Sequence, residues 1–318
     1  MLKRVLFIDS THPILVQRLE NMGFKCEHFE NYNYADYKRI VSEYNGLIIR
    51  SGIPINKELL DVAINLKFIG RVGAGLENID IEYAEAKGIL CINAPEGNRD
   101  AVGEHTLAML LNILNRIRIA DQEVRAGIWK REENRGTELS GKTIGIIGYG
   151  NMGSAFAKRL QGFDVHTIAY DKYKNNYSSN LVKEEQMQTL FDTCDVVSLH
   201  IPFTKETEYL VNEAWINKFK KPIFLINTSR GQIVKTEDLI KGIENGKILG
   251  ACLDVLEFEG KSFEKLDNTS SESMNYLINS NKVILTPHIA GWTHESNFKL
   301  ANVIADKISL FKKSFDNN

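Results

Sequence analysis

The sequence has 318 residues, of which 43% are hydrophobic and 25% are charged. This length favours two domains, and the composition is that of a globular protein able to bury a substantial core. The formal net charge is only −2, so no overall field attracts nucleic acid or an anionic membrane, and we expect neither as a partner. Local arginines can still select a small anionic substrate.

The cysteine pattern and the first residues of the chain indicate the cellular compartment. The four cysteines lie far apart with no Cys-x-x-Cys pair (Cys26, Cys91, Cys194 and Cys252), so a disulfide framework or a zinc site is a poor expectation. We therefore expect no metal and a reducing, cytoplasmic environment. The apolar run at 5–8 is too short for a signal peptide and predicts a first strand, and no run is long enough to span a membrane.

Residues 1 to 100 alternate short apolar runs with helical stretches, which predicts a small α/β unit with a largely parallel sheet. The strand-like runs are 5–8, 46–49, 68–72 and 89–92, and the helix-like stretches are 13–22, 57–63 and 81–87.

Two loops of this unit carry features that sheet formation does not require. Arg50 and Arg71 each stand where an apolar run ends, at the carboxyl ends of predicted strands, where open α/β sheets hold ligands. The successive amides of Gly73, Ala74 and Gly75 can form an anion-binding nest, to which a neighbouring arginine adds a bidentate donor. For either arginine alone, a surface charge at a loop start is an equally good interpretation.

A long helical stretch follows from about Asp100, whose short acceptor side chain suits an N-cap. Apolar residues recur around much of its circumference up to Ile119, which predicts packing between domains or against a second subunit. Glu104 and His105 lie near its start, and a buried, satisfied pair is a better interpretation than a catalytic one. The charge-rich run 130–135 is typical of a solvated face.

The stretch 143–171 predicts strand, glycine turn, helix, strand and acid in succession. In this pattern Gly148 permits the tight turn, Gly150 lets the backbone approach a pyrophosphate, and Gly153 lets the helix lie close to the strand. Asp171 follows the second strand, where a carboxylate accepts hydrogen bonds from a ribose diol and repels a 2′-phosphate. The pattern favours NAD over NADP.

Beta-alpha alternation continues beyond Asp171. We predict helices near 183–191 and at 236–244, and a closing helix at 295–311. The predicted strands are 195–199, 223–226, 248–253 and 283–285. This alternation after a glycine turn is typical of a doubly wound fold. The polar stretch 262–281 is expected to be a loop with one short helix.

Polar clusters follow three of these predicted strands. Arg230 comes after 223–226, Asp254 and Glu259 come after 248–253, and His288 comes after 283–285. Parallel strands deliver their carboxyl ends to one edge, so these side chains can converge. An imidazole exchanges a proton near neutral pH, a neighbouring carboxylate fixes its tautomer, and a guanidinium clamps a carboxylate. Strand-end caps or surface charges are the alternative for any one of them.

Several motifs in order carry a family resemblance: RVGAGLENID, NAPEGN, VGEH, GYGNMG, LHIPFT, NTSRG, CLDVLEFE and TPHIAGW. Over nearly its whole length the chain resembles the D-isomer-specific 2-hydroxyacid dehydrogenases, and within them the D-3-phosphoglycerate dehydrogenases. The resemblance implies a flavodoxin-like substrate domain (1–100 and 291–318) and a Rossmann NAD domain (101–290), both doubly wound parallel-sheet domains, with the active site in the cleft between them.

The resemblance also implies residue roles. His288 would exchange the proton, Glu259 would orient it, and Arg230 would bind substrate. Because Gly260 follows Glu259 where the family usually has proline, Glu257 remains an alternative to Glu259. The implied cofactor contacts are Gly148, Gly150, Asn151, Met152, Gly153, Asp171, His200, Pro202, Thr228, Ser229, Asp254 and Gly291.

Substrate choice is implied by three arginines. Arg50 and Arg71 match positions that hold a substrate phosphate, Arg131 matches one that reaches across from a partner subunit of a homodimer, and the turn Gly73, Ala74, Gly75 would take the carboxylate. The expected activity is NAD-dependent oxidation of D-3-phosphoglycerate to 3-phosphohydroxypyruvate in serine biosynthesis; the alternative is reduction of glyoxylate, hydroxypyruvate or another 2-oxo acid. The sequence stops at Asn318, so we expect no serine-sensing domain and no inhibition by serine.

Overall fold

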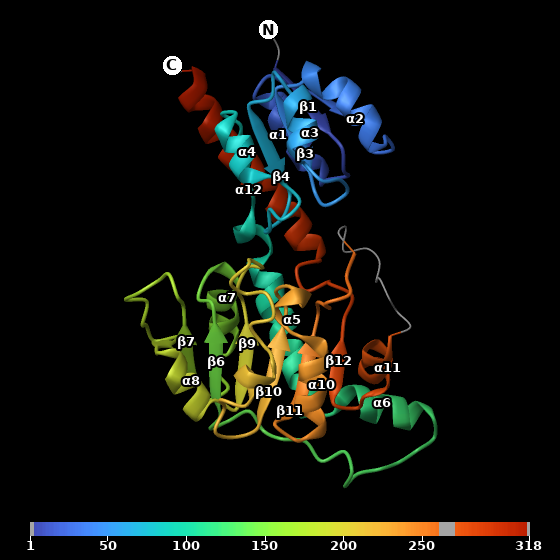
Figure 1. Ribbon diagram of the computed structural model, residues 1–318, viewed down its shortest axis with the longest axis vertical. Coiled ribbons are helices and arrows are strands. Elements are labelled where there is room, and N and C mark those ends of the chain that lie inside the picture. The colour runs from blue at the N-terminus through green and yellow to red at the C-terminus, as the bar shows by residue number, and fades with distance from the viewer. Residues whose placement is uncertain (1–2, 261–270, 317–318) are drawn as a thin grey trace. The chain divides into compact units, whose positions relative to one another are not determined.

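The computed structural model describes residues 3–260 and 271–316. They divide into two compact units, one formed by residues 3–98 with 292–316 and the other by residues 99–260 with 271–291. Both units contain a parallel β-sheet flanked by helices (Figure 1).

The first unit has a five-stranded parallel sheet in the order β2-β1-β3-β4-β5, which is the flavodoxin-like order. Alternate residues of β1 point to opposite faces: Val5 and Phe7 pack with α1 and α12, whereas Leu6 packs with α2, α3 and α4. Its elements are β1 (Lys3–Phe7), α1 (Pro13–Asn21), β2 (Phe24–His28), α2 (Tyr34–Ile40), η1 (Val41–Glu43), β3 (Gly46–Ile49), α3 (Lys57–Val62), β4 (Phe68–Arg71), α4 (Ile81–Ala86), β5 (Leu90–Ile92) and α12 (His294–Asp316).

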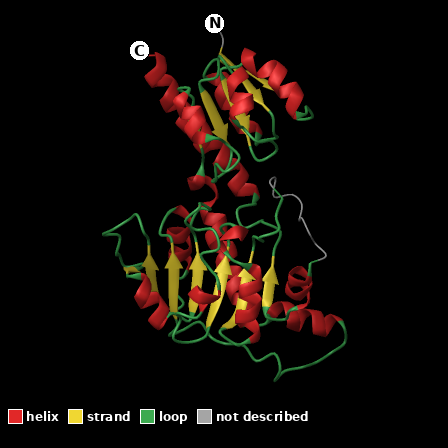
Figure 2. Cartoon of the chain, viewed as in Figure 1, coloured by secondary structure: helices red, strands yellow, loops and turns green. Residues whose placement is uncertain are grey.

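The second unit has a seven-stranded parallel sheet in the order β12-β11-β10-β9-β6-β7-β8. The chain order reverses between β6 and β9, as in the Rossmann fold, and helices lie on both faces of the strands (Figure 2). Its elements are α5 (Pro95–Leu114, which begins in the first unit), α6 (Ile117–Arg125), β6 (Thr143–Ile147), α7 (Asn151–Arg159), β7 (His166–Tyr170), β8 (Lys183–Glu184), α8 (Met187–Thr193), β9 (Val196–Leu199), α9 (Glu213–Ile216), β10 (Ile223–Asn227), η2 (Gly231–Ile233), α10 (Thr236–Glu244), β11 (Ile248–Leu253), α11 (Glu272–Asn279) and β12 (Val283–Leu285).

The predicted fold class is confirmed, with differences in individual elements. The long helix begins at Pro95 rather than Asp100, because proline suits a first helical position. It ends at Leu114 rather than Ile119, since Arg116 adopts a left-handed conformation with φ of 54°. The predicted helix near 183 is wrong at its start, where β8 lies. Of the predicted loop at 262–281, the part from 261 to 270 lies outside the described residues, and α11 forms in the rest.

The apolar side chains that suggested a partner for the long helix are largely buried in the second unit's own core. Met109, Leu110 and Leu114 pack there against strand residues. Among the helices of the described residues, none combines the length and the apolar character needed to cross a membrane.

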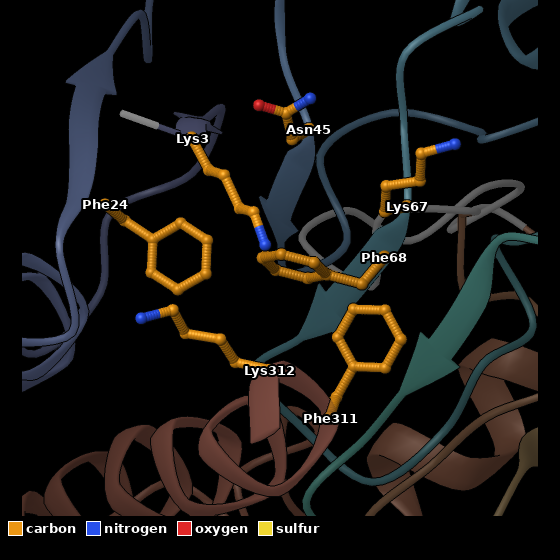
Figure 3. Close-up of a pocket in the computed structure, with 7 residues that line it drawn as sticks. All are labelled: Lys3, Phe24, Asn45, Lys67, Phe68, Phe311 and Lys312. Carbon is orange, nitrogen blue, oxygen red and sulfur yellow. The ribbon is translucent and has the colours of Figure 1, made fainter. Parts of the chain in front are cut away.

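A cavity of about 70 Å³ lies in the first unit, at the amino-terminal edge of the sheet (Figure 3). Its lining comes from the starts of strands and from the end of α12: Lys3, Phe24, Asn45, Lys67, Phe68, Phe311 and Lys312. Ligands of open α/β sheets bind at the opposite, carboxyl edge, so this cavity is not the candidate active site.

Candidate active site

Three adjacent strands of the second unit deliver their following turns to one sheet edge. In register, Asn227 of β10 pairs with Leu253 of β11, and Leu253 pairs with Leu285 of β12. The turns 228–231, 254–259 and 286–291 therefore start from aligned positions at the carboxyl edge, to which the arrows of β10, β11 and β12 point in Figure 1. The polar clusters expected from the sequence occupy these three turns.

His288 is paired with Glu259. Its Nδ1 lies 2.7 Å from Glu259 Oε2, and the other carboxylate oxygen accepts the amide of Leu256 at 2.5 Å. A carboxylate only accepts, so Nδ1 carries the proton and Nε2 is the ring nitrogen that can exchange one with a substrate.

Glu257, the alternative partner, points elsewhere. Its oxygens accept the hydroxyl of Tyr209 at 2.8 Å and the amide of Thr236 at 3.0 Å. The open choice between the two glutamates is thus decided geometrically for Glu259.

Asp254 holds the backbone around the histidine. Its main-chain oxygen accepts the amide of His288 at 2.7 Å, while its carboxylate accepts the amides of Ile289 at 2.9 Å and Ala290 at 2.8 Å. His288 thereby keeps a left-handed conformation, with φ of 55°, which is uncommon for a side chain other than glycine. Burial alone would raise the pKa of Asp254, but hydrogen bonds from His105, Thr286 and these amides outweigh it and lower the pKa.

The Asn227 side chain shapes the turn that presents Arg230. Asn227 Oδ1 accepts the Ser229 amide at 3.1 Å and hydroxyl at 2.7 Å, and its Nδ2 donates to the Arg230 carbonyl. A Cβ on Gly231 would lie 2.0 Å from the backbone of Leu256, so glycine lets this turn lie directly against the turn that carries Glu259. Thr228 contacts Thr106 of α5, oxygen to oxygen, at 3.2 Å.

The glycine turn between β6 and α7 fits a pyrophosphate. Gly148 has φ of 90°, and a Cβ there would lie 2.5 Å from the carbonyl of His200; a Cβ on Gly153 would lie 2.1 Å from the Gly148 carbonyl. In front of Gly150 there is open space instead. No side chain caps α7, which begins with Asn151 and Met152, so its amides and positive dipole end face this space.

Asp171 lies beside the same turn, directly after β7. Its Oδ2 accepts the amide of Tyr149 at 2.8 Å, and its Oδ1 accepts the amides of Tyr173 at 2.9 Å and Lys174 at 3.1 Å. The carboxylate is thus fixed next to the phosphate-binding turn, and Oδ2 keeps one lone pair for a hydroxyl of the ribose.

His200 and Pro202 follow β9 on the other side of the turn. His200 Nε2 contacts the hydroxyl of Ser198 at 2.9 Å, and its buried Nδ1 has no hydrogen-bond partner among the described residues. Burial lowers the pKa of His200 to about 3, so the ring is neutral. Although the residue keeps some accessible surface, the unsatisfied nitrogen is enclosed.

The predicted substrate arginines of the first unit lie at the carboxyl ends of two paired strands: Arg50 directly follows β3, and Arg71 is the last residue of β4, opposite Ile49. The Arg50 guanidinium stacks over the Trp292 ring at 4.2 Å, and burial lowers its pKa. Within the described residues it forms no ion pair, but the carboxylate of Asp9, which accepts the Arg50 amide at 2.5 Å, attracts the guanidinium.

The glycine turn of the first unit differs from the expected three-amide nest. The Gly73 amide donates to the Arg71 carbonyl at 2.8 Å, which leaves the amides of Ala74 and Gly75 without an acceptor among the described residues. A Cβ on Gly73 would lie 1.3 Å from Arg71 Nη1, so the guanidinium folds directly over this turn.

Arg131 is exposed in an irregular segment after α6, so its reach to a partner subunit stays a prediction. Glu104 and His105 do not form the buried pair expected: Glu104 pairs with Arg159 at 3.2 Å, whereas His105 lies against Thr286 and Asp254. Within the described ranges, no group of three or more His, Cys, Asp or Glu side chains could hold a metal ion.

Residues 107–290 match the family model of the D-isomer specific 2-hydroxyacid dehydrogenase NAD binding domain. The chain belongs to the D-isomer-specific 2-hydroxyacid dehydrogenase family. NAD is the cofactor of this domain, and the glycine turn and Asp171 have the geometry to hold it.

The relatives have different substrates in their names. The chain is 34% identical to a D-3-phosphoglycerate dehydrogenase of Archaeoglobus fulgidus over 96% of its length and 56% of the relative, and 37% identical to a glyoxylate reductase of Thermococcus litoralis over 86% and 82%. It spans about half the length of the phosphoglycerate dehydrogenases of A. fulgidus and Bacillus subtilis. A D-lactate dehydrogenase of Aquifex aeolicus, solved with NAD and lactic acid, has a TM-score of 0.81 at 27% identity over 98% of this chain and 96% of its own.

Proposed function

We propose that this protein oxidises D-3-phosphoglycerate to 3-phosphohydroxypyruvate, as a cytoplasmic step of serine biosynthesis. The observation that carries the proposal is the pair of arginines at the carboxyl ends of the adjacent strands β3 and β4, next to the turn of Ala74 and Gly75. A small unphosphorylated acid needs one anion site, whereas phosphoglycerate needs two. Arg50 is partly desolvated, and although Asp9 attracts its guanidinium, the guanidinium forms no ion pair among the described residues, which suits a dianionic phosphate.

The second unit supplies the chemistry in this proposal. His288 Nε2 accepts the C2 hydroxyl proton while Glu259 stabilises the resulting imidazolium through Nδ1. Arg230 holds the substrate carboxylate and polarises the oxygen at C2. NAD held at the glycine turn would supply the acceptor for the C2 hydride. The reaction converts the alcohol to a ketone and yields NADH and one proton.

A second candidate keeps this chemistry with a smaller acid such as glyoxylate or hydroxypyruvate. The observation in its favour is the position of Arg71, whose guanidinium folds over the Gly73 turn. One arginine and two adjacent amides suffice to bind a single carboxylate, and Arg50 would then serve only to pack against Trp292.

The deciding experiment compares NADH formation from D-3-phosphoglycerate, D-glycerate and D-lactate, using wild type, Arg50→Ala and Arg71→Ala. The proposal predicts turnover of phosphoglycerate alone, with a KM raised about 10- to 100-fold by loss of either charged hydrogen-bond donor. Turnover of glycerate at least as fast, with Arg50→Ala neutral, would favour the second candidate.

We also propose a homodimer, on grounds that differ from the apolar helix expected from the sequence. Large apolar side chains are exposed on and after α6, with Ile117 at 53%, Val124 at 53% and Trp129 at 78% exposure. Ile117 and Val124 are seven residues apart and so share one face of α6, and apolar groups exposed on one face are typical of interaction sites. Light scattering should give twice the monomer mass for wild type and a lower mass for Val124→Glu with Trp129→Ser.

A further inference from the structure

His105 on α5 contacts two residues that are distant in the chain, Thr286 and Asp254. The carbonyls of both accept the amide of His288. Nε2 of His105 lies 3.1 Å from Thr286 Oγ1 and 3.5 Å from Asp254 Oδ1. The His105 side chain is 21% exposed and that of Asp254 only 1%, so the contact to Asp254 is made in a largely desolvated environment, where a hydrogen bond orients strongly.

The hydrogens of this cluster can be assigned by counting donors. The Thr286 hydroxyl has one hydrogen, and its shortest contact is to Asp254 Oδ1 at 2.6 Å; its approach to the Met109 sulfur is 3.8 Å. Because that hydrogen goes to the carboxylate, the hydroxyl oxygen accepts from His105. Nε2 of His105 is therefore protonated and donates toward both Thr286 and Asp254.

The Asp254 carboxylate in turn determines the backbone at His288. Its oxygens accept the two amides that follow His288, and its main-chain oxygen accepts the amide of His288 itself. These bonds stabilise the left-handed backbone of His288, a conformation that is disfavoured for a side chain with a Cβ. A rotation of the carboxylate would release the amides of Ile289 and Ala290 and move the imidazole away from Glu259.

We propose that His105 is a positioning residue for the catalytic histidine: its Nε2–H, through Thr286 and Asp254, fixes the turn 286–290 so that His288 Nδ1 stays on Glu259. This inference rests on the proposed role of His288 in proton transfer. His105 touches no reacting atom in this account. Because Asp254 is also an implied cofactor contact, the proposal requires that loss of the His105 donor lowers kcat much more than it lowers NADH affinity.

The test compares His105→Gln, whose amide nitrogen can replace Nε2 as a donor, with His105→Leu, which cannot donate. We expect His105→Leu to lower kcat about 10- to 100-fold, the size of effect that a small misplacement of a reacting group produces, with NADH affinity within twofold of wild type. His105→Gln should recover most of kcat. Thr286→Val, which removes the linking hydroxyl at nearly constant volume, should match His105→Leu. The control is Glu104→Gln on the same helix, which should leave kcat unchanged.

A double-mutant cycle separates positioning from general support of the fold. If His105 acts through His288, adding His105→Leu to His288→Asn changes kcat no further. Additive losses, an equal loss in His105→Gln, or a parallel loss of NADH affinity would overturn the proposal.

A structural readout makes the test independent of the substrate. The proton on His288 Nδ1 should give a downfield NMR resonance that vanishes in His288→Asn. We expect it to be lost or shifted in His105→Leu and retained in His105→Gln. An unchanged resonance in His105→Leu overturns the proposal even if no acid is turned over, whereas absence of turnover by the wild type with the resonance behaving as expected would overturn only the proposed function.

Discussion

The carboxyl edges of the two sheets hold their polar groups in different ways. At the edge of the seven-stranded sheet, the carboxylates of Asp254 and Glu259 accept hydrogen bonds from backbone amides. Glu259 also accepts from the His288 ring, so these bonds fix His288. At the edge of the five-stranded sheet, Arg50 is held by stacking on an indole ring. One edge is a hydrogen-bonded network, and the other presents a cation that stacks on an indole ring and forms no ion pair among the described residues.

This difference corresponds to two physical tasks. A proton transfer needs one geometry, since small misplacements of the reacting atoms cost large factors in rate. An anion-binding group needs charge and partial desolvation, but an internal carboxylate would compete with the ligand for it. Changes in the first network should therefore act on kcat, and changes around the arginine should act on KM.

The largest effect is expected at the His288–Glu259 pair. His288→Asn and Glu259→Gln should each lower kcat by about 10²- to 10⁴-fold, the range of general acid–base catalysis, while NADH binding measured by fluorescence is retained. The matched control is Glu257→Gln, which removes a charge two residues away whose partners are Tyr209 and Thr236. If Glu257→Gln lost turnover and Glu259→Gln did not, the assignment of the pair would be exchanged.

A smaller effect is expected at Asp171. Asp171→Asn should raise the KM for NAD by about 10- to 100-fold, because charge-assisted hydrogen bonds to the ribose are weakened, and should lower the KM for NADP, since the repulsion of a 2′-phosphate is removed. Initial rates with both cofactors measure this. Glu206→Gln serves as the control, because Glu206 is a nearby carboxylate paired with Lys172 and Tyr173. Unchanged NAD and NADP constants in Asp171→Asn would exclude a ribose contact.

Much of the fold could be predicted because its signals are local. The succession of strand, glycine turn and helix at 143–159 lies within one short stretch, and the structure gives β6 and α7 there. β2 and α2 were not predicted, since β2 has only five residues with a mixed pattern of burial and its place in the sheet depends on pairing with β1. The break at Arg116 also carried no sequence signal, because a left-handed arginine is stabilised only by its surroundings.

The residues of the candidate site could be predicted from the sequence, but the contacts between them could not. Each strand-end residue follows a recognisable apolar run. The contact of His105 with Thr286 joins positions 181 apart, and the left-handed backbone of His288 has no local cue such as glycine. The choice of Glu259 over Glu257 depends on which carboxylate the 254–259 turn directs to the histidine, and this is a property of the turn's conformation.

The pH dependence of stability should reveal the buried His200, with an effect near 2 kcal/mol. Its pKa falls from 6.5 to about 3 on burial, so the unfolded chain binds this proton first as the pH decreases. The free energy of unfolding therefore decreases below about pH 6.5, and this group alone lowers it by about 2 kcal/mol between pH 7 and pH 5. Urea unfolding at pH 7 and pH 5 gives the free energy of unfolding at each pH. The decrease from pH 7 to pH 5 should be about 2 kcal/mol smaller in His200→Gln than in wild type. An equal decrease in both proteins would mean that the imidazole is accessible to protons in the folded state.

The smallest effect is expected at Trp292, and it addresses the stacked arginine directly. A cation over an indole face contributes about 0.5 to 2 kcal/mol, depending on its desolvation, so Trp292→Leu should raise the KM for phosphoglycerate about 2- to 30-fold with kcat nearly unchanged. Trp292→Phe keeps an aromatic face and should lie between wild type and leucine. If Trp292→Leu instead lowers KM, the indole competes with the substrate for Arg50, and the stack holds the arginine away from the anion rather than presenting it. Steady-state kinetics with phosphoglycerate separate the two, because the KM rises if the stack presents Arg50 to the anion and falls if the stack holds it away.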